Sequence, residues 1–151
     1  MTNGKSRMLR MAASLAGAAL VVALSACGAD GDAAISGISN DITGSLSEWA
    51  IELDAGAAAA GTVNFTITNN GTIEHEFVIV KTDIPDGEIP LVEDKFQEDA
   101  EGVEVIDEME KMAKGVTETL TVNLEPGNYQ LVCNIVSHYG AGMHTGFVVN
   151  A

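Results

Sequence analysis

Three side chains near the C-terminus are of types that bind metals, and they lie at regular spacing. Four residues separate Cys133 from His138, and four more separate His138 from Met143. Copper(I) favours soft sulfur ligands and copper(II) accepts imidazole nitrogen, so two His, one Cys and a weak axial Met serve both oxidation states. The stretch from 133 to 143 therefore offers three of the four ligands of a mononuclear copper site.

The fourth ligand must come from elsewhere, and the chain contains only three histidines. His144 directly follows Met143, so His75 is the one that lies far from the stretch. His75 belongs to a strand-like run and shares a face with apolar residues. On its own, a histidine on such a face would be interpreted as a hydrogen-bonded core residue. The other metal-binding residues favour its interpretation as a ligand.

The first 26 residues have the three-part layout of a secretory signal. Three basic residues precede an apolar stretch from Met11 to Leu24, and small residues follow. This apolar run is shorter than the roughly 20 residues that span a bilayer. We therefore expect residues 1–26 to direct export rather than to anchor the chain.

The signal ends in Leu24-Ser25-Ala26-Cys27-Gly28, which resembles the cleavage box of bacterial lipoproteins. In such a box the Cys after the cleavage point carries lipid, and more than one acyl chain makes the anchoring stable. The alternative is plain signal cleavage. We expect a mature chain that starts at Cys27 and is lipid-anchored on the outer face of the bacterial cell membrane or in the periplasm. Cys133 is then the one free thiol in an oxidising compartment, and a bound metal explains its survival.

The chain is strongly acidic, with a formal net charge of −15 at pH 7. Because residues 1–26 carry three positive charges and no acids, the remainder carries −18. This charge excludes nucleic acid as a partner. About half of the 22 acidic residues lie between Asp83 and Glu110, with a single lysine among them. The stretch is either a solvated segment or a docking surface that steers a basic redox partner.

Composition divides the chain after the signal into a tether and one domain. Residues 27–45 are rich in Gly, Ala, Ser and Asp, which indicates a flexible tether before a domain at 46–151. Alternating apolar and polar residues predict the strands of this domain at 49–53, 63–68, 75–80, 117–124, 129–133 and 147–150. Residues 81–116 form a long acidic connection, in which 91–98 is compatible with a short helix and 103–106 with a strand.

Short strands at this spacing, separated by polar turns, predict an all-β fold, a Greek-key β-sandwich. Such an arrangement would bring His75 beside the last hairpin. Tyr129 is expected to serve the fold, with its hydroxyl bonded across a corner as in other sandwiches.

The C-terminal stretch resembles the copper loop of the cupredoxins, the plastocyanin and azurin superfamily. The resemblance lies in Tyr129-x-x-x-Cys133, His138 and Gly140-Ala141-Gly142-Met143. Plastocyanin has two residues between its Cys and His, and the four found here resemble rusticyanin and sulfocyanin more closely. The resemblance implies one type 1 copper ion with His75, Cys133 and His138 as equatorial ligands and Met143 as the axial ligand.

Two features near the ligands qualify this resemblance. Plastocyanin and azurin have Asn directly after the first His ligand, where this chain has Glu76. His144 is the alternative to Met143, although neighbouring side chains on an extended segment point apart. Met109 and Met112 are interpreted as packing residues rather than as copper(I) ligands.

The sequence favours a membrane-tethered one-electron carrier that is not an enzyme. The alternative is a copper-binding protein that sequesters the ion or delivers it to an exported oxidase. Multicopper enzymes need further His clusters, which three histidines do not provide. We expect the partner to be a redox protein of basic charge, a cytochrome or an oxidase, and the carrier itself to be a monomer.

Overall fold

Alternating apolar and polar residues form strands throughout residues 38–151, the part of the chain that the computed structural model describes. The strands are β1 (Asp41–Ser47), β2 (Ala50–Leu53), β3 (Ala57–Ala59), β4 (Gly61–Asn69), β5 (His75–Lys81), β6 (Leu91–Val92), β7 (Lys95–Phe96), β8 (Glu104–Met112), β9 (Thr117–Leu124), β10 (Gly127–Val132) and β11 (His144–Asn150). The expected signal at 1–26, Cys27 and the tether up to residue 37 lie outside the described residues.

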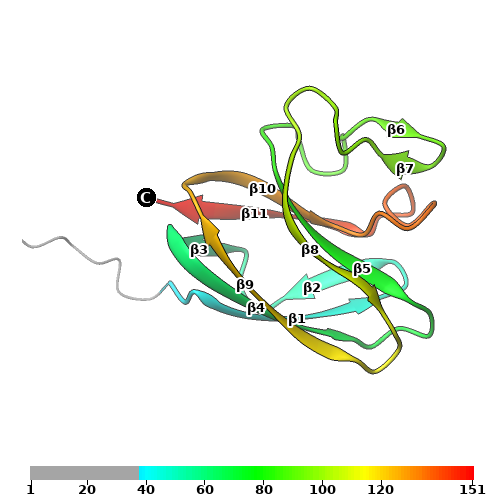
Figure 1. The fold of residues 1–151 in the computed structure, drawn as a ribbon, viewed down its shortest axis with the longest axis horizontal. Helices are drawn as coiled ribbons and strands as arrows, with labels where there is room; N and C mark the ends of the chain where they lie inside the picture. The colour runs from blue at the N-terminus through cyan, green and yellow to red at the C-terminus, as the bar shows by residue number, and fades with distance from the viewer. Residues whose placement is uncertain (1–37) are drawn as a thin grey trace, which may run out of the picture. The chain divides into compact units, whose positions relative to one another are not determined.

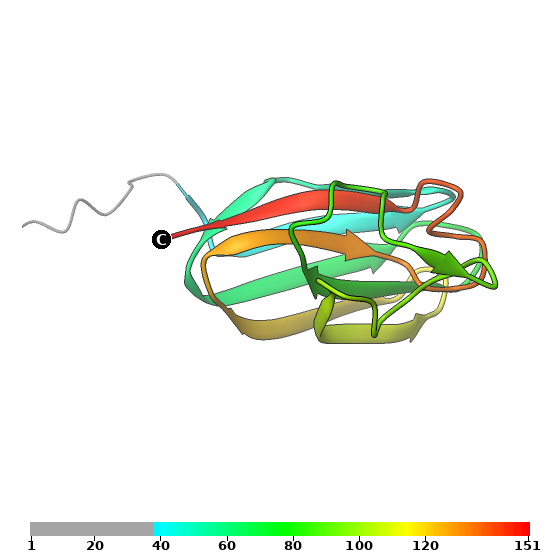
Figure 2. The ribbon, with the colours of Figure 1, turned by 90° about the horizontal axis from the view of Figure 1, so that it is seen from above.

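Two sheets face each other and form the predicted β-sandwich (Figures 1 and 2). One sheet has the order β2-β1-β4-β9, and the other has the order β3-β11-β10-β5-β8. Most pairs are antiparallel, but β1 runs parallel to β4 and β3 runs parallel to β11. The predicted all-β sandwich is thus confirmed, with mixed sheets. No helix in residues 38–151 is long and apolar enough to cross a membrane.

The order of the second sheet brings the His75 strand next to the last hairpin. β10 pairs with β11 on one side and with β5 on the other, so that Leu131 lies opposite both Thr145 and Ile79. The prediction that the sandwich places His75 beside this hairpin is confirmed.

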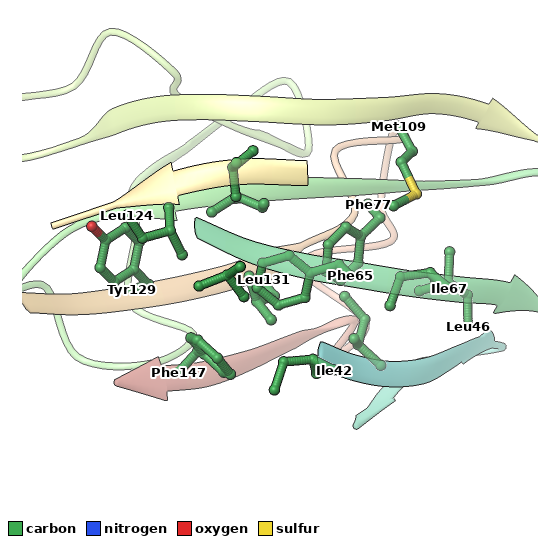
Figure 3. Packing of buried hydrophobic residues seen from close by; sticks show 14 of the residues in the cluster. Ile42, Leu46, Phe65, Ile67, Phe77, Met109, Leu124, Tyr129, Leu131 and Phe147 are labelled. Carbon is green, nitrogen blue, oxygen red and sulfur yellow. The ribbon is translucent and has the colours of Figure 1, made fainter. Parts of the chain in front are cut away.

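Aromatic side chains from both sheets fill the space between them (Figure 3). Phe65 of β4 contacts Phe77 of β5 and Phe147 of β11, with ring centroids 5.5 Å apart in both pairs. Alternation along β4 buries Val63, Phe65 and Ile67 and turns Asn64, Thr66 and Thr68 outward, as the sequence predicts, whereas Asn69 at the end of the strand is buried. Burial of such apolar area stabilises the fold by about 25 cal/mol per Å².

β5 is buried on both of its faces, because a second cluster covers the side that faces away from the core. Val78 and Val80 pack there against Ile89, Phe96 and Tyr139. Part of the acidic connection therefore folds over the sheet as a cover. The remainder extends into β8, which is longer than the strand expected at 103–106.

The helix considered for residues 91–98 does not form. β6 and β7 make a two-stranded hairpin instead, and its turn residues Glu93 and Asp94 have φ angles of 53° and 59°. Two successive positive φ angles are the signature of the tight turn that suits the twist of a hairpin.

The folded domain begins earlier than residue 46. β1 starts at Asp41, so residues 41–45, assigned to the tether, are part of a sheet. Ile42 is buried in the core, and its strand pairs with both β2 and β4. The small and polar residues of this segment concealed the strand, because only Ile42 and Leu46 of its side chains are fully buried.

Candidate metal centre

The four predicted ligands gather at one end of the sandwich. His75 is the first residue of β5, and Cys133 directly follows β10. His138 lies in the loop between β10 and β11, and Met143 directly precedes β11. This loop lies beside the β6–β7 hairpin, to which Ser137 donates a hydrogen bond at the carbonyl of Asp94 over 2.8 Å (Figures 1 and 2).

Three donor atoms converge within this loop region. Nδ1 of His138 lies 3.3 Å from Nδ1 of His75 and 3.3 Å from Sγ of Cys133. All three donor atoms lie within 4.8 Å of one another, and the three residues are buried. No other such group of His, Cys, Asp and Glu occurs in residues 38–151. One thiol and two imidazoles fit a copper ion that changes its oxidation state.

Met143 is held against two of the other ligands by its backbone. Its N–H donates to the carbonyl of His138 and its carbonyl accepts from the N–H of Cys133, both over 3.1 Å. The side chain is fully buried in the same cluster as Cys133. Gly142 has a φ of 109°, a conformation that glycine adopts without strain, and this turn directs the following residue inward.

The sulfur of Cys133 receives a hydrogen bond from the backbone. The N–H of Glu76 donates to Sγ over 3.3 Å. Burial raises the pKa of the Cys133 thiol, and this N–H opposes the rise. Because the backbone makes the bond, the contact does not depend on the side chain at position 76, where the chain departs from plastocyanin.

Asn134, directly after the cysteine, ties the loop to the β6–β7 hairpin. Its side-chain oxygen accepts from the N–H of Phe96 over 2.9 Å, and its amide donates to Glu98 over 2.8 Å. Asn134 is buried, so these bonds fix the backbone next to the thiol.

The two histidines are kept neutral by their surroundings. Burial lowers the pKa of both His75 and His138, and the nearby carboxylate of Glu48 partly opposes this in each case. A neutral imidazole has a lone pair for a metal, whereas an imidazolium has none. The site is therefore ready to bind a cation at neutral pH.

Sequence reasoning missed two residues that contact these histidines. Glu48 and Trp49 form the turn between β1 and β2. Oε1 of Glu48 lies 3.6 Å from Nε2 of His75, and the Trp49 ring packs edge-on against His138 with centroids 4.8 Å apart. Neither contact has a local signal in the sequence, because the parallel pairing of β1 with β4 brings this turn to the metal centre.

Other predictions about individual residues are confirmed. His144 points away from the centre, and its Nδ1 lies 3.0 Å from Oδ1 of Asp86. Met109 and Met112 are buried in the core cluster. The hydroxyl of Tyr129 donates to the carbonyl of Glu125 over 2.8 Å, which is the expected corner.

Comparison with known proteins decides the family. The model of the copper binding proteins of the plastocyanin/azurin family matches residues 50–150. The chain belongs to this family. As a cupredoxin, it has a type 1 copper site made by His75, Cys133, His138 and Met143.

Solved cupredoxins have the same fold. The dithionite-reduced auracyanin of Roseiflexus castenholzii is 25% identical, with a TM-score of 0.57 over 76% of this chain and 100% of that one. Rusticyanin of Thiobacillus ferrooxidans is 18% identical, with a TM-score of 0.52 over 74% of this chain and 79% of that one. At this lower identity the likeness concerns the fold alone.

A shorter stretch of the sequence is similar to a metal uptake protein. It is 46% identical over 37 residues to the iron uptake system component EfeO of Yersinia pestis. The match covers 24% of this chain and 10% of that protein. The chain therefore spans only about a tenth of the length of the curated relatives it matches.

Proposed function

We propose that this cupredoxin carries single electrons. Copper held by the four ligands would alternate between Cu(II) and Cu(I), gaining and losing one electron. The observation that carries the proposal is one buried thiol and two buried imidazoles whose donor atoms lie within 4.8 Å of one another. No further His or Cys in residues 38–151 joins this group, which supports a carrier rather than an enzyme with a second copper.

The protein surroundings suit electron transfer because they hold the ligands still. His75 is on a central strand, and backbone hydrogen bonds connect Met143 to Cys133 and to His138. Ligands fixed by packing and by hydrogen bonds change position little when the charge at the site changes. The small rearrangement lowers the barrier to electron exchange.

An apolar surface next to His138 supports a route for the electron. His138 is only 5% exposed. Trp49, whose ring packs on His138, is 45% exposed, and Val136, two residues before His138 in the sequence, is 56% exposed. Leu91 and Val92 of the adjacent hairpin are also exposed. We call Trp49, Leu91, Val92 and Val136 the apolar rim. A partner that docks on this rim would exclude water and approach the copper closely.

We propose that the carrier works at a membrane surface. Lipid on Cys27 would hold an exported domain on the outer face of the cell membrane or in the periplasm, where a cytochrome or an oxidase is a suitable partner. Exposed acids on β8, namely Glu104, Asp107, Glu108 and Glu110, would attract a partner of basic charge.

Copper sequestration or delivery to an oxidase is the second candidate. The short match to an iron uptake component favours a role in metal handling. A buried site with a thiolate is less suited to exchange than an exposed set of Met and His. We therefore prefer electron transfer.

The first test is the visible spectrum of copper-loaded protein that lacks residues 1–26. We expect an intense blue or green band from thiolate-to-copper charge transfer. Failure to develop this band after copper loading would exclude a type 1 site.

The second test separates the two functions with Val136→Glu. A charge on the apolar rim should slow electron exchange with a partner, while the spectrum and the copper content stay unchanged. If the variant exchanges electrons at the native rate but transfers copper poorly to an acceptor protein, delivery replaces electron transfer as the function.

A further inference from the structure

An acidic side chain lies against the buried histidine ligand, on the side away from the other ligands. Nδ1 of His75 faces His138, and Nε2 faces Oε1 of Glu48 at 3.6 Å. His75 is fully buried, and its Nε2 is the one buried side-chain nitrogen or oxygen in residues 38–151 without a hydrogen-bond partner. The carboxylate is the charged group closest to hydrogen-bonding distance.

Glu48 is held in this place by the loop that leads to His75. Its Oε1 accepts hydrogen bonds from the N–H of Thr72 over 2.6 Å, from the Thr72 hydroxyl over 3.0 Å and from the N–H of Ile73 over 3.1 Å. Three donors on one oxygen order the carboxylate and favour its charged form.

The same loop is fixed from its other side by Asn69. Its side-chain oxygen accepts from the N–H of Gly71, and its amide donates to the carbonyls of Ile73 and Met112 over 2.8 and 2.7 Å. Both ends of the short loop are thus tied down. Movement of Glu48 relative to the His75 ring is restricted.

Gly71 leaves room for the carboxylate to approach the ring. A Cβ at this position would lie 2.8 Å from Nε2 of His75 and 2.9 Å from Oε1 of Glu48. Both distances are too short for an atom in that place. The absence of a side chain at position 71 therefore permits the contact between Glu48 and His75.

We propose that Glu48 is a positioning residue of the copper site, which keeps the proton of His75 on Nε2 and stabilises Cu(II) relative to Cu(I). A negative charge near Nε2 favours the tautomer that leaves Nδ1 free to bind the metal. The same charge interacts more favourably with the more highly charged ion. Glu48 therefore lowers the reduction potential. The inference rests on the proposed electron-transfer function only in that copper occupies the site.

The decisive variant is Glu48→Gln, which removes the charge but keeps an oxygen that can accept from Thr72 and Ile73. Glu74→Gln is the matched control, because Glu74 adjoins His75 in the sequence, is exposed and loses the same charge. Both are made in the protein that lacks residues 1–26 and are measured by voltammetry. We expect the reduction potential to rise in Glu48→Gln and to change much less in Glu74→Gln.

The affinity for Cu(II) should fall about 10- to 100-fold in Glu48→Gln, as is usual when a partner of a ligating histidine is lost. The affinity for Cu(I) should fall less. Each tenfold difference between the two losses corresponds to a rise of about 59 mV for a one-electron couple.

Gly71→Ala tests the contact without a change of charge. The added methyl group would lie 2.9 Å from Oε1 of Glu48, so it should push the carboxylate away from the ring, and the reduction potential should rise here too. This variant also keeps the inference testable if Glu48→Gln does not fold.

The metal-free protein provides a readout that does not depend on copper. Nitrogen NMR of His75 should show a proton on Nε2 in the native protein and in Glu74→Gln, and a mixture of tautomers in Glu48→Gln. Native behaviour of Glu48→Gln and Gly71→Ala in both the tautomer and the potential would overturn the inference. A native protein that binds copper without a type 1 spectrum would instead overturn the proposed function, and the tautomer would still decide the role of Glu48.

Discussion

The two histidine ligands differ in their surroundings, and we expect them to differ in their roles. His75 is fully buried and lies against an anionic side chain, whereas His138 lies near the surface under the ring of Trp49. His75 is thus the ligand through which the protein sets the electrostatics of the site. His138 is the ligand closest to the apolar rim, through which a partner would exchange an electron.

At the residue scale, Cys133→Ser should abolish the coloured site. The substitution removes both the strongest ligand and the donor of the charge-transfer band. The sandwich should still fold, because its core consists mainly of apolar side chains from the facing sheets. Absorption spectra check the first expectation and circular dichroism the second. A full band in the variant would exclude Cys133 as the ligand.

His144→Ala tests the alternative axial ligand. Because the His144 ring lies against Asp86 and Tyr139, its removal should leave the copper spectrum nearly unchanged. Met143→Ala is the companion variant, and it should alter the spectrum. If the two variants behave in the opposite way, His144 completes the site in place of Met143.

At the scale of elements, neighbouring strands deliver the ligands, and turns adjust them. β5 and β10 pair directly, so His75 and Cys133 are placed by the register of one sheet. The loop between β10 and β11 then closes on itself through hydrogen bonds. The turn between β1 and β2 comes from the other sheet. The metal centre therefore depends on the packing of both layers.

Tyr129→Phe should weaken the sandwich without changing the metal centre. The hydroxyl bond to the carbonyl of Glu125 lies at the start of β10, away from the end that carries Cys133. Loss of one such bond should lower the free energy of unfolding by about 1 kcal/mol. Urea unfolding of the metal-free protein measures this loss. An altered copper spectrum would show that the corner also influences the ligands.

At the scale of the whole molecule, we expect charge to govern how fast a partner arrives and the apolar rim to govern how closely it docks. Glu108 and Glu110 lie in a group of acids with Glu76 and Glu98. Burial raises the pKa of Glu108, and repulsion from the other three acids raises it further. This local surplus of negative charge would attract a basic partner over a distance of about a Debye length.

Neutralising Glu108 and Glu110 with Gln should flatten the salt dependence of association with a basic partner. The matched control is Glu52→Gln with Glu118→Gln, two exposed acids on the other sheet. Stopped-flow measurements at several ionic strengths compare the two pairs. Equal effects of both pairs would mean that net charge alone matters and that β8 is not a docking surface.

The attachment of the molecule to a membrane is tested by Cys27→Ala in the full-length protein. We expect the native protein in the membrane fraction and the variant in the soluble fraction, because the proposed lipid on Cys27 would provide the anchor. If both remain in the membrane fraction, the apolar stretch from Met11 acts as an uncleaved anchor.

The sequence by itself determined the ligands of the copper loop. Cys133, His138 and Met143 lie within 11 residues, so the chain keeps them close in any compact fold. Alternation likewise predicted β4, β5 and β9, because the period of a strand is a local property. His75 followed by elimination, and Tyr129 followed from its position before the cysteine.

Only the tertiary structure decided which distant residues reach the copper loop. Glu48 and Trp49 arrive through the parallel pairing of β1 with β4, which connects segments with no local pattern in common. Residues 91–96 form a hairpin with two positive φ angles at its turn, instead of the helix that the sequence allowed. The hairpin is favoured because Phe96 packs against the outer face of β5. Contacts of this kind depend on the register between strands, and register is set by the packed core as a whole.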